Sequence, residues 1–129
     1  LKGNSTMPIT PEEMKRRTKQ FGLRAINLVT SLPKTEEARV IGRQLLRSAT
    51  SVGANYRAAC RAKSNKDFVF KMGIVEEEAD ESVFWMELIV ESDLMKKERA
   101  TDLMTEGEEL TAIAVSSINT ARRGGRKKD

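Results

Sequence analysis

The chain has 129 residues, of which 39% are apolar and 33% charged, and its formal net charge is +4. This length allows one domain with a modest core, and the composition is typical of helical proteins with a large surface and of subunits that complete their burial by association. Histidine is absent and Cys60 is the single cysteine, which removes the commonest general base and metal ligand and excludes an intrachain disulfide. We therefore expect no enzyme activity, no catalytic residue, no metal and no cofactor.

The sequence also lacks the signals of membrane insertion and secretion. No apolar run approaches the ~18 residues that a bilayer span needs, and no basic patch followed by an apolar stretch opens the chain. We expect a cytoplasmic protein with no membrane partner.

Charge is segregated along the chain. Residues 122–129 carry five cations and one carboxylate, a net charge of +4, so the rest of the chain is neutral as a whole. Within it, residues 11–34 and 35–63 each sum to +4, whereas residues 64–93 sum to −7. Two basic segments therefore precede one acidic segment with which they can pair.

The first predicted helix begins in the stretch ITPEEM. Thr10 is a good N-cap, Pro11 suits the first helical position, and Ile9 and Met14 stand where a hydrophobic staple places its members. Apolar residues then recur at steps of three and four until Pro33, which predicts a helix of about 20 residues.

Three further helices follow by the same signals. Thr35 and Ser64 are predicted N-caps of the second and third helices, the second running to a break near Lys63 and the third to about residue 91. The fourth helix starts after the polar stretch 92–98 and is predicted to end at Gly124 and Gly125. Its predicted inward positions are Leu103, Gly107, Leu110, Ala114, Ser117 and Ala121.

Short connections between helices force neighbours to be antiparallel, so the predicted fold is all-α, an up-down-up-down antiparallel four-helix bundle. The predicted bundle spans residues 10–122. Residues 1–9 are a predicted flexible leader, and residues 123–129 a basic tail that its composition predicts to be disordered.

Four arginines share one face of the second predicted helix. At about 100° per residue, Arg43, Arg47, Arg57 and Arg61 fall within an arc of about 80°, opposite the apolar face. Three interpretations stay open: a solvated helix face, which is the commonest role of such charges, a phosphate-binding stripe, or a subunit contact in which the arginines pair with acids of a neighbouring chain.

The third predicted helix has a second apolar face. Phe70, Phe84 and Leu88 lie roughly opposite its core stripe, with Glu77 and Glu81 among them. We expect this face to form an oligomer interface, because a monomer gains nothing by exposing it; the alternative is that the first or fourth helix covers it.

Polar residues also flank the buried face between the second and third helices. A hairpin pairing brings Ser48, Ser51 and Asn55 near Glu78, where we expect an intrachain polar network that fixes helix register. A catalytic carboxylate cluster in EEEADE is disfavoured, because carboxylates at this spacing point around the whole helix and the di-iron arrangement needs histidines that are absent.

Three stretches resemble a known family: RRTKQFGLRAINLV, IGRQLLRSATSVGANYRAACRAKSNKDF and the run from Glu78 to Trp85. The chain, from about residue 10 to 121, is similar to bacterial four-helix-bundle proteins encoded in intervening sequences of 23S ribosomal RNA genes. The resemblance implies an up-down bundle that assembles as a ring, typically a homopentamer. A related bundle protein accompanies the reverse transcriptases of diversity-generating retroelements and binds nucleic acid. No catalytic activity is attached to the family.

The motif positions of the family fall, by this resemblance, on the second and third predicted helices. They are Arg47, Ser48, Ser51, Asn55, Arg57, Glu78, Glu81 and Trp85. The Phe84-Trp85 pair departs from the family, where Tyr is commoner as the first member.

The expected function is therefore a ring-forming, homo-oligomeric bundle that binds structured RNA or DNA electrostatically. The expected nucleic-acid-binding residues are Arg43, Arg47, Arg57, Arg61, Arg122, Arg123, Arg126, Lys127 and Lys128. The alternative is a protein–protein adaptor whose arginine face is used in subunit contacts.

Overall fold

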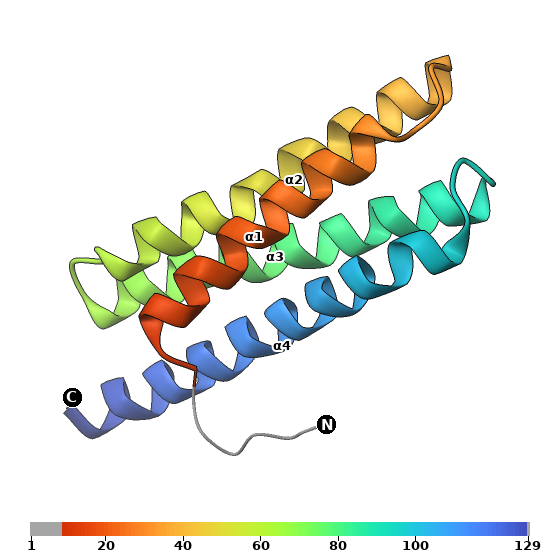
Figure 1. The fold of residues 1–129 in the computed structure, drawn as a ribbon. Coiled ribbons are helices and arrows are strands. Elements are labelled where there is room, and N and C mark those ends of the chain that lie inside the picture. Colours follow the sequence, from red (N-terminus) through yellow and green to blue (C-terminus); the bar gives the residue numbers. More distant parts are fainter. Residues whose placement is uncertain (1–8, 129) are drawn as a thin grey trace.

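The structure is a computed structural model that describes the backbone of residues 9–128 and the side chains of residues 9–125. Four helices follow one another: α1 (Pro11–Thr30), α2 (Glu36–Cys60), α3 (Asn65–Glu91) and α4 (Lys97–Lys128). Figure 1 shows them as an up-down-up-down bundle, and no strand occurs between residues 9 and 128. The predicted fold class is confirmed.

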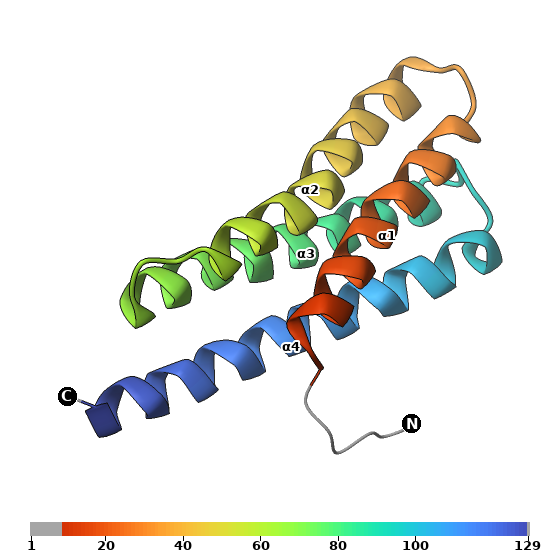
Figure 2. The same ribbon diagram turned by 60° about the vertical axis from the view of Figure 1, so that its left-hand side comes forward.

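Each helix packs beside its neighbours in the chain, and α1 also touches α4, so α1 and α3 are diagonal partners. The contact between α1 and α4 is the least extensive, and α4 extends well beyond the start of α1 (Figures 1 and 2). The carboxyl-terminal part of α4 therefore lies against α3 without α1 above it.

The predicted caps are present. The side chains of Thr10, Thr35 and Ser64 accept hydrogen bonds from the backbone N–H groups of Glu13, Ala38 and Asp67, at 3.1, 3.2 and 3.0 Å. Each bond satisfies one of the N–H groups that a helix start leaves without a partner. These local signals account for three of the four helix starts.

The core follows the predicted stripes closely. Phe21, Leu45, Met72 and Leu110 are fully buried, one from each helix. In the last turns of α4 the buried residue is Ile118, whereas Ser117 is half-buried. The larger apolar side chain takes the inward position because its burial contributes more than that of serine.

The predicted end of the fourth helix differs from the observed one. α4 continues through Gly124 and Gly125 to Lys128, so the segment 123–128, expected as a disordered tail, is helical. The Asn65 side-chain amide donates to the Ala121 carbonyl at 2.6 Å, and a Cβ at Gly125 would lie 2.5 Å from the same nitrogen. This contact with the α2–α3 turn holds the helix past the point where composition predicts its end. The predicted leader, apart from Ile9, lies outside the described residues.

Glycines of α2 and α4 allow neighbouring helices to approach closely. A Cβ at Gly53 would lie 3.3 Å from the Thr18 backbone, and one at Gly107 would lie 2.7 Å from the Val83 side chain. Because glycine has no side chain, α2 lies closer to α1, and α4 closer to α3, than another residue at these positions would allow.

Candidate nucleic-acid interface

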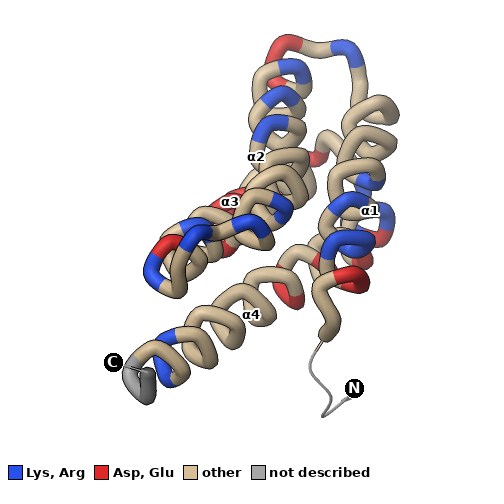
Figure 3. The backbone as a smooth tube through the Cα atoms, turned by 90° about the vertical axis from the view of Figure 1, so that its left-hand side faces the viewer, with Lys and Arg blue, Asp and Glu red and all other residues tan. Residues whose placement is uncertain are grey.

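The outer face of α2 presents cations to solvent. Arg43, Arg57 and Arg61 are exposed, because the flanks of α2 are occupied by α1 and α3, and Thr50 and Ala54 are exposed between them. Within the described side chains no carboxylate lies within salt-bridge distance of these three guanidinium groups. Figure 3 shows lysine and arginine positions recurring along α2 and around its turn into α3.

Arg47, the fourth member of the predicted stripe, points to α3 instead. Its guanidinium forms ion pairs with Glu78, at 3.4 Å, and with Glu81. Glu81 also accepts a 3.0 Å hydrogen bond from the Trp85 indole. Arg47 was predicted to bind nucleic acid and Glu81 to serve an oligomer interface; in the structure the two residues join α2 to α3 within one chain.

The predicted polar network is formed only in part. Ser82 donates to Ser48 at 3.0 Å across the α2–α3 contact, and both hydroxyl groups are fully buried. Ser51 and Asn55 instead donate to carbonyls one turn back in α2, at 2.6 and 2.8 Å. Glu78 is taken by Arg47, because a cation is a stronger partner for a carboxylate than a hydroxyl or an amide. Ser82 was not predicted as a member of this network. A serine at a core position of the third predicted helix was the feature of the sequence that could have indicated it.

The second apolar face of α3 is exposed in this chain. Phe70 and Phe84 keep 67% and 48% of their surface accessible, and neither α1 nor α4 covers them. Leu88 is half-buried and Glu77 is exposed on the same side. The Phe84 ring meets Trp85 edge-on with centroids 5.0 Å apart. The alternative in which another helix of the same chain buries this face does not hold.

The fold gathers further cations at the turn between α2 and α3. The Asn65–Ala121 hydrogen bond fastens this turn to the last turns of α4. Lys66 and Arg122 follow the two bonded residues directly in the sequence and line the same groove, and Lys63 and Arg123 are exposed next to them in the sequence. Sequence reasoning missed both lysines, since only the contact between residues 65 and 121 reveals their neighbourhood. The side chains of Arg126, Lys127 and Lys128 lie outside the described part of the chain.

One carboxylate in this region, that of Asp67, is paired with a lysine of its own helix. Asp67 accepts from the Lys71 ammonium at 3.0 Å and from the Lys63 backbone N–H at 3.1 Å. The hydrogen bond from Lys71, followed by the one from Lys63, lowers the pKa of Asp67 below its usual value. Asp67 and Lys71 therefore form a neutral pair at physiological pH, and Asp67 does little to offset the surrounding cations.

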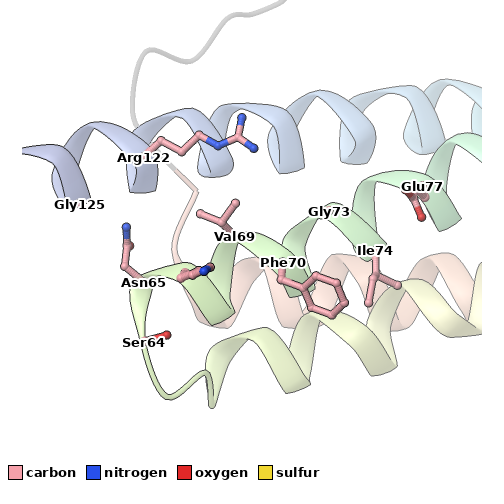
Figure 4. Close-up of a pocket in the computed structure, with 10 residues that line it drawn as sticks. Ser64, Asn65, Val69, Phe70, Gly73, Ile74, Glu77, Arg122 and Gly125 are labelled. Carbon is pink, nitrogen blue, oxygen red and sulfur yellow. The ribbon is translucent and has the colours of Figure 1, made fainter.

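An open groove of about 1070 Å³ runs between the start of α3 and the end of α4. Val69, Phe70 and Ile74 supply its apolar surface, and Lys66 and Arg122 its cationic groups (Figure 4). Gly73 opens onto it and Glu77 lies at the end farthest from Asn65.

The described part of the chain contains neither a metal-binding cluster nor a helix suited to crossing a membrane. No group of three or more His, Cys, Asp or Glu side chains in this part of the chain could hold a metal ion. None of the described helices is long and apolar enough to cross a membrane.

Comparison with known proteins identifies the family. Residues 12–116 match the model of the 23S rRNA-intervening sequence protein family. A solved structure, that of a protein of unknown function from the S23 ribosomal protein family of Bacteroides thetaiotaomicron, superimposes with a TM-score of 0.79 at 31% identity, covering 86% of this chain and 99% of that one. No match was found among curated proteins. The chain belongs to the 23S rRNA-intervening sequence protein family.

Proposed function

We propose that the protein is a non-enzymatic, ring-forming homo-oligomer, with five subunits favoured, that binds structured RNA in the cytoplasm. The five-subunit ring rests on the resemblance described above. The nucleic-acid-binding role rests on the charges of the exposed surface.

The observation that carries the proposal is a set of exposed cations without carboxylate partners in the described structure, which we call the cationic surface. It follows the outer face of α2, turns with the chain into α3 and reaches the end of α4 (Figure 3). Its members are Arg43, Arg57, Arg61, Lys63, Lys66, Arg122 and Arg123.

Such a surface suits the phosphate backbone. Guanidinium groups bind phosphate oxygens through two parallel hydrogen bonds, and each phosphate contact releases counterions. A ring repeats the surface in every subunit, so that weak contacts add up along one RNA molecule. Affinity should then depend steeply on salt and little on sequence.

The proposed subunit contact uses the outer face of α3, with Phe84 and Leu88 at its centre. An exposed phenylalanine with a second apolar residue one turn away is unusual in a monomer, and its burial between subunits would stabilise an oligomer. Glu77 supplies a carboxylate on the same face for a cation of the neighbouring chain.

The test compares two arginines of α2 in a binding assay with labelled structured RNA over a range of salt concentrations. Arg57→Ala should lower the affinity and reduce the slope of log K against log salt by about one. Arg47→Ala is the matched control, and it should change the slope less because Glu78 and Glu81 already neutralise Arg47. Absence of any RNA binding by the wild-type protein at low salt would refute the proposal.

A protein–protein adaptor is the second candidate, favoured by the exposed apolar face of α3. In that case acids of a neighbouring chain occupy the α2 arginines and no phosphate reaches them. A double-mutant cycle of Arg57→Ala and Glu77→Ala on oligomer stability separates the two: coupled losses indicate an ion pair between chains, and independent losses leave Arg57 free for phosphate.

A further inference from the structure

We infer that the groove between α3 and α4 binds an unpaired nucleotide of the nucleic acid. This inference rests on the proposed function and deepens it, because it assigns a class of ligand to one site. The groove is open and mixes apolar and cationic residues (Figure 4).

Phe70 is the proposed stacking platform. It is the most exposed large apolar side chain described, at 67%, and it is one of the lining residues of the groove, with its ring extending from α3 on the side away from α4 (Figure 4). Stacking of a base on an aromatic side chain is tolerant of sequence and requires that the base is free of its own stack. Val69 and Ile74 add apolar surface beside the ring.

Arg122 and Lys66 are the proposed phosphate partners. Both line the groove, one from α4 and one from α3, and Figure 4 shows the Arg122 side chain extending along it. No ion pair with a described carboxylate occupies either of them. A base on Phe70 would thus have cations on both sides of the groove for its flanking phosphates.

Gly73 gives an independent indication that something outside the chain enters. Glycine inside a helix is unfavourable compared with alanine, and its lack of a Cβ allows a close approach to the backbone. A Cβ at Gly73 would have no neighbour within 4 Å, whereas those at Gly53 and Gly107 would meet other helices. Packing within the chain does not require Gly73, but a ligand lying against the α3 backbone would.

Charge favours a nucleic acid over a second copy of the chain at this end of α3. The groove is bordered by the cationic surface, Glu77 is the one carboxylate among the described residues that line it, and Asp67 in the first turn of α3 is paired with Lys71. Phe84, two heptads further along α3, stands among acids instead, since Asp80 and Glu87 are exposed near it. The two phenylalanines of one helix are therefore assigned different ligands.

The experiment measures binding of a labelled oligouridylate of about 20 nucleotides and of a blunt duplex of equal length. Phe70→Ala should weaken oligouridylate binding about tenfold and leave duplex binding unchanged. Leu23→Ala is the control, an exposed apolar residue of α1 outside the groove and outside the proposed subunit contact, and should leave the binding of both probes unchanged. Arg122→Gln should weaken both.

A second pair of variants guards against effects on folding. Gly73→Ala should weaken oligouridylate binding without lowering the melting temperature, because the new methyl group meets nothing in the chain. Gly124→Ala also faces open space and should leave the binding of both probes unchanged.

The outcomes separate this inference from the proposed function. If the wild-type protein binds neither probe, the proposed function fails. If it binds both and Phe70→Ala changes neither, the groove is not a nucleotide site and the proposed function stands. If Phe70→Ala lowers the oligomer mass in light scattering as Phe84→Ala does, the groove belongs to a subunit contact and the inference is overturned.

Discussion

Arginines of this chain differ in role because the fold brings carboxylates to some of them and not to others. Arg17 on α1 binds Glu106 and Glu109 of α4, Arg47 binds Glu78 and Glu81 of α3, and Arg57 has no described carboxylate beside it. Helical periodicity placed Arg47 and Arg57 on one face. It could not predict which of them lies close enough to the next helix to be neutralised.

Arg17 forms ion pairs across the least extensive contact of the bundle, that between α1 and α4. Its guanidinium donates to both oxygens of Glu106, at 2.9 and 2.6 Å, and to Glu109 at 2.8 Å. The hydrogen bond to Glu106 is the largest cause that raises the pKa of Arg17 above its ordinary value, so the pair stays ionised.

We predict that Arg17→Ala lowers the free energy of unfolding by about 2 kcal/mol, because Glu106 would be left largely buried without its partner. Urea denaturation at one fixed protein concentration measures the loss. Arg39→Ala removes an exposed pair with Glu36 and should change stability by less than about 0.5 kcal/mol. Equal effects of the two variants would contradict this account of Arg17.

Helical periodicity also could not predict the hydrogen-bond partners of the polar residues of α2. Ser48 was predicted to take part in an interhelical network, and it does so with Ser82. Ser51 and Asn55 lie on the same flank but donate to carbonyls of their own helix. Short polar side chains can bond either to their own backbone or to a neighbouring helix, and their spacing in the sequence does not predict which.

At the scale of the helices, starts were easier to predict than ends. Thr10, Thr35 and Ser64 act within their own turn, so the local sequence contains the whole signal. The end of α4 depends instead on Asn65, which is far away in the sequence and reaches Ala121 only in the folded bundle.

The end of α3 is closed by a residue in the left-handed region. Asp93 has φ 63°, and the Leu94 N–H donates to the Ile89 carbonyl at 3.0 Å, as in a Schellman motif. We predict that stability at position 93 falls in the order Gly, Asp, Ala, with about 1 kcal/mol between Asp93→Gly and Asp93→Ala. Thermal melts of the two variants beside the wild type test the order, and a more stable Asp93→Ala would contradict it.

The contact between α3 and α4 depends on Gly107. A Cβ there would lie 2.7 Å from Val83 and 3.3 Å from Phe21, both of them buried. We predict that Gly107→Ala destabilises the protein by about 2 kcal/mol despite the higher helix propensity of alanine. Gly124→Ala, which has open space, should be neutral or stabilising in the same chemical denaturation experiment. A stabilising Gly107→Ala would show that α4 can move away at no cost.

At the scale of the whole molecule, the bundle leaves two unlike surfaces side by side. The cationic surface suits phosphates, and the apolar face of α3 around Phe84 suits another protein chain. Helical rotation alone predicted the arginine face of α2, apart from the pairing of Arg47, and the apolar face of α3, because each lies on a regular helix. It could not predict the joining of the α2–α3 turn to the end of α4, which extends the cationic surface and forms the groove.

The most direct test of the proposed ring that binds RNA is the solution mass by light scattering, at low and high salt, with and without a structured RNA. We predict a mass of about five subunits of 14.5 kDa that persists at high salt, and uptake of RNA at low salt only. A monomer would contradict the role assigned to Phe84 and Leu88, and a ring that takes up no RNA at low salt would contradict the role assigned to the cationic surface.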